Sequence, residues 1–193
     1  KAELLQKHKN ANLAANAENM EKATAKGLDA ALLEQLKLNE KTIDSMSDGL
    51  RQIAALADPV GEMDEFRTRP NGLKIGKMRV PLGTIGIIYE SRPNVTLDAA
   101  ALCLKSGNSC LLRGGSEAFQ SNMAIAKIIR QALLEHDVTA DAVCFIENTD
   151  RESVGAMLQL PEWIEVSIPR RNKNLVARIS AEARVPVIKH LEG

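Results

Sequence analysis

Three short segments of the 193-residue chain place charged or hydroxyl side chains beside the start of a helix: 89–96 (YESRPNVT), 113–118 (RGGSEA) and 169–174 (PRRNKN). In RGGSEA, two glycines allow close backbone approach, an arginine adds charge, and the following helix offers N–H groups to an anion. The candidate phosphate- or ribose-binding residues are therefore Arg113, Gly114, Gly115, Ser116 and Glu117. Ser116 and Glu117 suit ribose hydroxyls or the edge of a 2′-phosphate. The alternative is that the glycines only turn the chain into a helix capped by Ser116, because a GxGxxG fingerprint is absent.

The YESRPNVT segment is a candidate anion-recognition loop. Arg92 is suited to pair with a carboxylate or phosphate, while Ser91 and Asn94 can donate hydrogen bonds. The alternative is that Asn94 or Thr96 only caps a helix that begins there, with surface charges around it. His190 is either a general base or an ordinary loop histidine. No metal-ligand cluster or Ser/His/Asp order stands out, so we expect no metal site.

Composition excludes several classes of protein. Lys and Arg total 25, as do Asp and Glu, so the net charge is zero and generic nucleic-acid binding is disfavoured. No apolar run approaches the roughly 20 residues of a membrane span, and the opening residues KAELLQKHKN lack a secretory signal. Cys103, Cys110 and Cys144 lie in apolar stretches without a CxxC pair, which predicts reduced, buried thiols in a cytoplasmic protein.

The elements that must position these loops begin with a helical third of the chain. Helices are expected over 1–26, 28–38 and 40–57. Gly27 closes the first helix and Asn39 caps the third. In the third helix, apolar residues recur at spacings of three and four and form one stripe: Ile43, Met46, Leu50, Ile53 and Leu56.

Residues 60–81 are predicted to form a β-hairpin. Asn71-Gly72 is a strong signal for a two-residue turn. The apolar alternation changes phase after Ile75, which predicts a bulge at Gly76 or Lys77. Such a hairpin either stays within its own domain or acts as a dimerising arm.

From Leu82 onward, strands and helices alternate. Strands are expected over 83–89, 109–113, 142–147, 163–168 and 185–189, and helices over 94–105, 117–136, 151–158 and 172–183. Continuous apolar strands separated by helices are typical of a parallel sheet covered on both faces. The predicted fold class is α/β, with N-terminal helices, a protruding β-hairpin and a doubly wound Rossmann-like parallel sheet. Ligands bind beyond the carboxyl ends of such strands, where the three loops lie.

The segment RVPLGTIGIIYESRPNVTLDAAALCLKSGNSCLLRGGSEA (79–118) resembles the gamma-glutamyl phosphate reductases, or glutamate-5-semialdehyde dehydrogenases, of the aldehyde dehydrogenase superfamily. The likeness continues upstream through TRPNGLKIGKMRVPLG and downstream through NTDRESVGAML to ARVPVIKHLEG, so it covers nearly the whole chain. It implies three parts: a helical segment over 1–59, an oligomerisation arm over 60–81 and a Rossmann-like NADP-binding domain over 82–193.

The resemblance also implies a reaction, the NADPH-dependent reduction of L-glutamate 5-phosphate to L-glutamate 5-semialdehyde in proline biosynthesis from glutamate. A cysteine thiolate attacks the acyl phosphate, phosphate leaves, and hydride transfer reduces the thioester. On this basis the RGGSEA residues bind the cofactor NADPH/NADP, and Ser91, Arg92 and Asn94 bind the substrate. A cytoplasmic homo-oligomer, and association with glutamate 5-kinase, are further expectations.

Two departures from the family pattern affect these expectations. The family's nucleophilic cysteine lies in a later motif that none of the three cysteines matches, so we expect it beyond Gly193 in a longer protein, and the 193 residues alone to be inactive. The family's IPRGG reads IPRRNKN, which places Arg171 and Asn172 where two glycines belong. Both departures motivate the alternative function, a non-catalytic nucleotide-binding or oligomerisation module.

Overall fold

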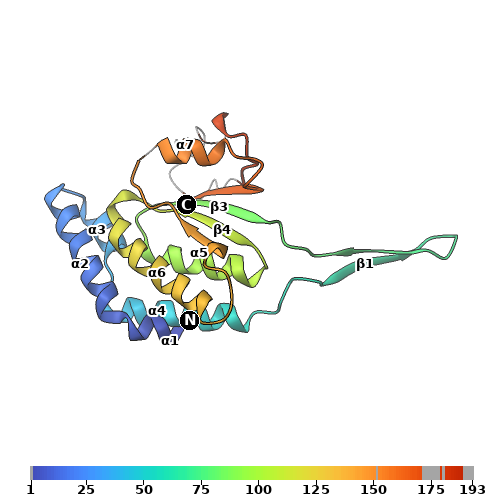
Figure 1. The fold of residues 1–193 in the computed structure, drawn as a ribbon, viewed down its shortest axis with the longest axis horizontal. Coiled ribbons are helices and arrows are strands. Elements are labelled where there is room, and N and C mark those ends of the chain that lie inside the picture. Colours follow the sequence, from blue (N-terminus) through green and yellow to red (C-terminus); the bar gives the residue numbers. More distant parts are fainter. Residues whose placement is uncertain (1, 151, 171–178, 180, 189–193) are drawn as a thin grey trace.

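The computed structural model describes residues 2–150, 152–170, 179 and 181–188. In Figure 1, a parallel sheet carries helices on both faces and a long hairpin projects away from it. The described helices are α1 (Ala2–Lys7), α2 (Lys9–Ala25), α3 (Ala30–Leu36), α4 (Glu40–Ala55), α5 (Pro93–Lys105), α6 (Phe119–Leu134) and α7 (Glu152–Leu158). The strands are β1 (Met63–Thr68), β2 (Lys74–Met78), β3 (Thr84–Tyr89), β4 (Ser109–Arg113), β5 (Val143–Phe145) and β6 (Val166–Arg170). This arrangement confirms the predicted α/β class.

The parallel sheet has the strand order β5-β4-β3-β6. Within this sheet the chain first forms β3, then adds β4 and β5 on one side of it, and finally places β6 on the other side. This reversal is the doubly wound topology, and its switch point lies between the carboxyl ends of β3 and β6, where such sheets bind ligands. Val187 makes a single parallel bridge to Ser167 of β6, where the last strand was expected.

The helices form layers on the two faces of the sheet (Figure 1). On one face, Ile87 of β3 and Leu112 of β4 share a core with residues of α5 and α6, and the same core includes Leu5 and Ile43 from the N-terminal helices. On the opposite face, Ile88 packs with residues of α7 and the segment that follows it. The sheet that carries these loops is therefore held between two packed cores.

Two helix ends follow the predicted local signals. Gly27 has a left-handed φ of +69°, and the N–H of Leu28 donates to the carbonyl of Ala23 at 3.2 Å, which closes α2. The Asn39 side chain accepts the N–H of Thr42 at 2.8 Å and starts α4.

Other helix bounds differ from the sequence predictions. The helix expected over 1–26 is divided at His8, which leaves helical geometry with φ −98° and ψ 17°. The helix expected from residue 28 starts at Ala30, because the Asp29 side chain accepts the N–H of Leu32 at 2.8 Å and so caps it.

The hairpin has a three-residue tip, so the predicted two-residue turn is wrong. The N–H of Arg69 donates to the carbonyl of Leu73 at 2.8 Å, and the N–H of Gly72 donates back to Arg69 at 2.9 Å. Pro70 and Asn71 occupy the central turn positions, the first of which favours proline. Gly72 follows with φ +84°, a conformation that glycine adopts without strain.

The predicted bulge lies at the expected position along the hairpin, but it is in β1 and the sequence pattern placed it in β2. The register shifts between Asp64 and Arg67 of β1, so Glu65 and Phe66 oppose Gly76 of β2. A side chain on Gly76 would lie 2.8 Å from the Phe66 ring. Gly76 therefore lies where the Phe66 ring packs across β2. This packing explains why the apolar pattern of β2 changes phase opposite a bulge that is in β1.

Two further predicted boundaries are corrected. The helix α5 begins at Pro93, so neither Asn94 nor Thr96 is its N-cap; proline fits the first helical turn because no N–H is needed there. The strand expected over 163–168 begins only at Val166, because Trp163 lies in a turn after α7 and is 71% exposed. The helix expected over 172–183 falls largely outside the described residues.

The helix α2 buries a stripe of three asparagines, Asn12, Asn16 and Asn19, against α6 and α3. The Asn16 amide donates to the Leu36 carbonyl at 2.8 Å and accepts the N–H of Leu38 at 2.8 Å. Asn19 accepts both the N–H and the hydroxyl of Ser121, the latter at 2.9 Å. These bonds fix the N-terminal helices relative to the start of α6.

Asn16→Leu is expected to lower the free energy of unfolding by about 3 kcal/mol, because it leaves the buried Leu36 carbonyl and Leu38 N–H without the amide that pairs them. Asn12→Leu is the matched control. Both amide atoms of Asn12 are buried without a hydrogen-bond partner among the described residues. Replacing it with an apolar side chain of similar volume should leave stability unchanged or raise it. Urea denaturation measures both changes, and equal losses for the two variants would contradict this explanation.

Candidate functional site

The loop after β3 and the loop after β4 meet at the carboxyl edge of the sheet. Ser91 donates its hydroxyl to Oε2 of Glu117 at 2.6 Å, and Ser116 donates to Oε1 of the same carboxylate at 3.1 Å. The two serine hydroxyls thus bond to different oxygens of one carboxylate. Ser116 is exposed and Glu117 is half-buried, which leaves both accessible at the loop surface.

The two glycines of RGGSEA allow close contact with the protein itself. A Cβ on Gly114 would lie 2.3 Å from the Asn122 amide nitrogen and 3.1 Å from the Tyr89 ring. A Cβ on Gly115 would lie 2.3 Å from the Ser91 hydroxyl. Glycine is thus required at both positions for this loop packing, whereas approach of a ligand to the backbone stays a prediction.

A buried polar network lies beneath both loops. The Tyr89 hydroxyl and the Thr96 hydroxyl are 2.6 Å apart, and Thr96 donates to Oδ1 of Asn122 at 3.0 Å. Burial raises the pKa of the Tyr89 hydroxyl above its usual range, so the group stays protonated at ordinary pH. Thr96 and Asn122 are each fully buried. The network joins β3, α5 and α6, and the local sequence pattern gave no sign of it.

Arg113 is buried, with 4% of its surface exposed. Its Nη1 donates to the Gly114 carbonyl at 2.7 Å, and its Nη2 donates to the carbonyls of Thr149 and Asp150 at 3.1 and 3.4 Å. The guanidinium therefore links the RGGSEA loop to the loop that precedes α7. This geometry gives Arg113 a supporting position below the loop.

The cation of the YESRPNVT loop is exposed. Within the described residues, the Arg92 side chain makes one long hydrogen bond, from Nε to the Gln35 side chain at 3.3 Å. Asn94 is half-buried and its side chain bonds to Asp98 one helical turn later. Burial raises the pKa of the Asp98 carboxyl, and the bond from Asn94 opposes this shift. Ser91 and Arg92 thus lie on the loop and Asn94 lies in the first turn of α5; of the three, Arg92 is the most exposed.

The third candidate loop cannot be placed beside these two. Arg171, Asn172 and the rest of 171–174 fall outside the described residues, as does His190. Arg170 ends β6 and is exposed.

No protein-family model matches the chain. Among the crystal structures that match nearly all of it, however, are two gamma-glutamyl phosphate reductases. The gamma-glutamyl phosphate reductase of Thermotoga maritima is 46% identical, with a TM-score of 0.94, over 97% of this chain and 45% of that protein. The gamma-glutamyl phosphate reductase of Saccharomyces cerevisiae is 31% identical, with a TM-score of 0.88, over 100% of this chain and 49% of that protein.

This chain belongs to the gamma-glutamyl phosphate reductase family. The resemblance in the sequence is thereby confirmed, and the chain spans about half the length of the two reductases. An engineered glycolyl-CoA reductase with bound NADP+ is only 18% identical, with a TM-score of 0.61 over 93% of this chain and 46% of that one, and so shows the shared fold alone.

The thiols of this family member are poorly placed for chemistry. Cys103 and Cys110 are buried, whereas Cys144 is partly exposed, which corrects the prediction that all three are buried. The hydrogen bond between Cys103 and Cys110 lowers the pKa of Cys103 and, together with burial, raises the pKa of Cys110. Burial limits the access of a reaction partner to Cys103. Burial and the nearby Asp141 carboxylate raise the pKa of Cys144. Because the thiolate is the nucleophile, a raised pKa makes a thiol unreactive at neutral pH.

Labelling with a thiol reagent at neutral pH should therefore modify Cys144 first and slowly, and leave Cys103 and Cys110 protected until the chain unfolds. Mass spectrometry of the labelled peptides identifies the site. Guanidinium-unfolded protein, in which all three cysteines react, is the control. Rapid native labelling of Cys103 or Cys110 would contradict the described packing.

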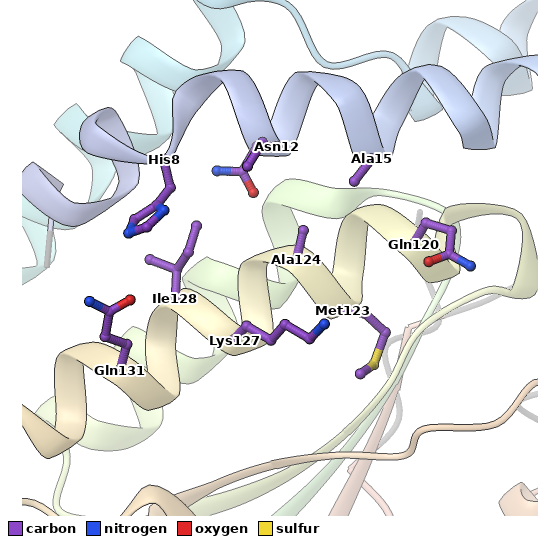
Figure 2. A pocket seen from close by; sticks show the side chains of 10 residues that line it. His8, Asn12, Ala15, Gln120, Met123, Ala124, Lys127, Ile128 and Gln131 are labelled. Carbon is purple, nitrogen blue, oxygen red and sulfur yellow. The ribbon is translucent and has the colours of Figure 1, made fainter.

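A separate groove of about 390 Å³ lies between α2 and α6 (Figure 2). Its walls carry His8, Asn12, Met123, Lys127 and Gln131. The groove is formed by helices on one face of the sheet and includes no residue of the two loops at the strand ends. The family's fold binds ligands at the strand ends, so the candidate site of this reductase relative is at the loops.

Within the described ranges, no set of three His, Cys, Asp or Glu side chains is grouped so that it could hold a metal ion. Among the same residues, no helix has the length and apolar character to cross a membrane.

Proposed function

We propose that the protein containing this chain reduces L-glutamate 5-phosphate to L-glutamate 5-semialdehyde, with NADPH as the reductant and release of phosphate. The observation that carries the proposal is the meeting of an arginine-bearing loop and a Ser-Glu loop at the carboxyl edge of the sheet, in a chain 46% identical to a gamma-glutamyl phosphate reductase. This reaction is a step of proline biosynthesis. We place the protein in the cytoplasm, where its thiols stay reduced.

The RGGSEA loop is proposed to hold the adenosine ribose of the nucleotide. The Glu117 carboxylate and the exposed hydroxyl of Ser116 are groups that pair with a ribose hydroxyl. Arg113 supports the loop from below through the Gly114 carbonyl. NADPH supplies the hydride when bound. Its 2′-phosphate replaces the 2′-hydroxyl of that ribose, which leaves the 3′-hydroxyl to pair with Glu117, and the phosphate and the carboxylate repel each other. Comparing NADPH with NADH therefore tests the cofactor preference directly.

The YESRPNVT loop is proposed to hold the anionic groups of the substrate. Arg92 is exposed and weakly bonded, so it is available to pair with the phosphate or carboxylate. Asn94 lies one helical turn before Asp98 and is oriented by it. Ser91 belongs to the same loop but donates its hydroxyl to Glu117. The nucleophilic cysteine is proposed to come from outside these 193 residues, because Cys103 and Cys110 are buried and the pKa of Cys144 is raised.

A chimera tests the proposed function. This chain replaces the corresponding part of the Thermotoga maritima reductase, and nicotinamide absorbance follows formation of NADPH from glutamate 5-semialdehyde, phosphate and NADP+. We expect the chimera to be active, its Arg92→Ala variant to need about tenfold more phosphate for half-maximal rate, and the isolated chain to bind NADPH without turnover. A folded chimera without activity, together with NADPH binding by the isolated chain, would favour a non-catalytic nucleotide-binding module.

The hairpin is proposed to pair with another copy of the protein. Its apolar side chains are each between 44% and 63% exposed: Met63, Phe66, Leu73, Ile75 and Met78. A projecting hairpin that exposes so much apolar surface is typical of an interaction site.

Light scattering after gel filtration checks this proposal. Phe66→Lys with Ile75→Lys should convert an oligomer into a monomer, because a lysine ammonium must then be desolvated at the contact. Leu134→Lys, at an apolar position 63% exposed on the end of α6, is the matched control and should leave the mass unchanged. A monomeric parent chain would contradict the role of the hairpin.

A further inference from the structure

The groove between α2 and α6 contains buried polar atoms that the protein does not pair. Nε2 of His8 and both amide atoms of Asn12 have no hydrogen-bond partner among the described residues. Asn12 is only 1% exposed. In Figure 2, the His8 ring and the Asn12 amide enter the space between the two helices from the side of α2. A buried polar atom destabilises the folded chain unless water, an ion or a ligand pairs with it, so these atoms indicate an occupant of the groove.

Asn12 differs in this respect from the other two asparagines of the buried stripe on α2. Asn16 pairs with two backbone groups, and Asn19 pairs with Ser121. Those bonds join one helix to another, whereas the Asn12 amide bonds to none of the described residues. An apolar side chain of similar volume would fill the position of Asn12 without loss of stability. Holding the helices together therefore does not account for this amide.

The rest of the lining shows which chemistry the groove accepts. The side chain of Lys127 brings an exposed ammonium group to the α6 side, and Gln120 and Gln131 add neutral amides. None of the described residues that line the groove is acidic. The remaining lining side chains are apolar: Ala11, Ala15, Met123, Ala124 and Ile128. A volume of about 390 Å³ is within the range of small-molecule sites. The lining thus suits a small anion with an apolar part.

We infer that this groove is a second ligand site, for a small aliphatic carboxylate with an amino or hydroxyl group on the adjacent carbon. The carboxylate accepts from Nδ2 of Asn12, and from Nε2 of His8 when that atom carries the ring proton. The Lys127 ammonium supplies the opposite charge. The amino or hydroxyl group donates to Oδ1 of Asn12, and the aliphatic part packs on Met123 and Ile128.

One molecule of this class satisfies all three unpaired atoms at once. The donor group on the adjacent carbon is needed because Oδ1 of Asn12 can only accept. The groove includes no residue of the loops at the strand ends, so the inference goes beyond the proposed function and does not depend on it.

Amide NMR spectra of the 193-residue chain, titrated with four compounds of one carbon skeleton, test this site. L-Valine and L-2-hydroxyisovalerate carry both groups, isovalerate lacks the donor, and L-valinamide lacks the carboxylate. We expect L-valine, L-2-hydroxyisovalerate or both to shift the side-chain amide signal of Asn12, with a Kd of about 1 mM, which is ordinary for a ligand of this size. The stronger of the two shows whether the donor is an amine or a hydroxyl. Isovalerate and L-valinamide should bind about tenfold more weakly.

Three variants separate binding from folding. Asn12→Leu should keep or raise the melting temperature of the parent chain, yet bind the preferred compound about tenfold more weakly. Lys127→Met should also weaken binding, by about fivefold, because the opposite charge is lost. Asn10→Leu, at an exposed position of α2 that does not line the groove, is the matched control and should bind like the parent chain.

Three results would overturn the inference. The first is an Asn12 amide signal that none of the four compounds shifts at about 20 mM, twenty times the expected Kd, which would leave the groove to water. The second is binding by Asn12→Leu as tight as that of the parent chain. The third is equal binding of all four compounds, because it would show that neither the carboxylate nor the donor is recognised.

Discussion

Gly114→Ala is expected to lower the free energy of unfolding by about 2 kcal/mol and to weaken NADPH binding about tenfold. The added methyl group would lie 2.3 Å from the Asn122 amide nitrogen and 3.1 Å from the Tyr89 ring. Asn122 cannot easily move aside, because it is fully buried and accepts a hydrogen bond from Thr96. Overpacking a dense site of this kind costs about 1–3 kcal/mol. Displacement of the loop by the clash should cost one ligand hydrogen bond, or about tenfold in affinity.

Gly155→Ala is the control for this substitution. Gly155 lies in α7, and a side chain there would have no heavy atom within 4 Å. Alanine in an open helical position should raise stability by about 0.5–1 kcal/mol. Urea denaturation and NADPH titration compare the variants, and equal stability of Gly114→Ala and the parent chain would contradict the described loop packing.

Arg113→Ala is expected to lower the free energy of unfolding by about 3 kcal/mol. The guanidinium is buried and donates to the carbonyls of Gly114, Thr149 and Asp150, which would lose a charged donor. NADPH should also bind about tenfold more weakly, since the loop that carries Ser116 and Glu117 loses its support. Thermal unfolding with and without NADPH measures both effects.

Arg92→Ala provides the matched arginine control. Its side chain is exposed and makes one long bond to Gln35, so its removal should change stability by less than about 0.5 kcal/mol. NADPH affinity should also be unchanged, because Arg92 is proposed to contact the substrate. An Arg113→Ala variant as stable as Arg92→Ala, with parent-like NADPH affinity, would contradict the supporting position of Arg113.

Local signals in the sequence predicted those parts of the fold that depend on neighbouring residues. Gly27 and Asn39 mark helix ends because a left-handed glycine and an amide cap act within a few residues. The strand expected over 109–113 is β4 with the same bounds. The hairpin was predicted, but its bulge was predicted on the wrong strand, because the pattern of β2 reflects the Phe66 ring that β1 carries.

The candidate site depends on contacts that local patterns do not contain. Ser91 meets Glu117 across 26 positions, and Asn19 meets Ser121 across 102. Motif reasoning selected the two loops, because strand ends and glycines are visible in the sequence. It placed Arg113 among the ligand contacts, whereas burial places it under the loop. Only the packed structure distinguishes a cation that supports a site from one that faces a ligand.

The most direct test of the central claim is thermal unfolding of the 193-residue chain during titration with NADPH, up to about 1 mM, the upper end of ordinary enzyme affinities. Ligand at 100 times its Kd stabilises a protein by about 2.7 kcal/mol, which for a chain of this size raises the melting temperature by about 5–10 °C. We predict a rise of that order with NADPH and a smaller rise in Gly114→Ala. A cooperative transition that neither NADPH nor NADH shifts would contradict the assignment of this chain as the nucleotide-binding part of a gamma-glutamyl phosphate reductase.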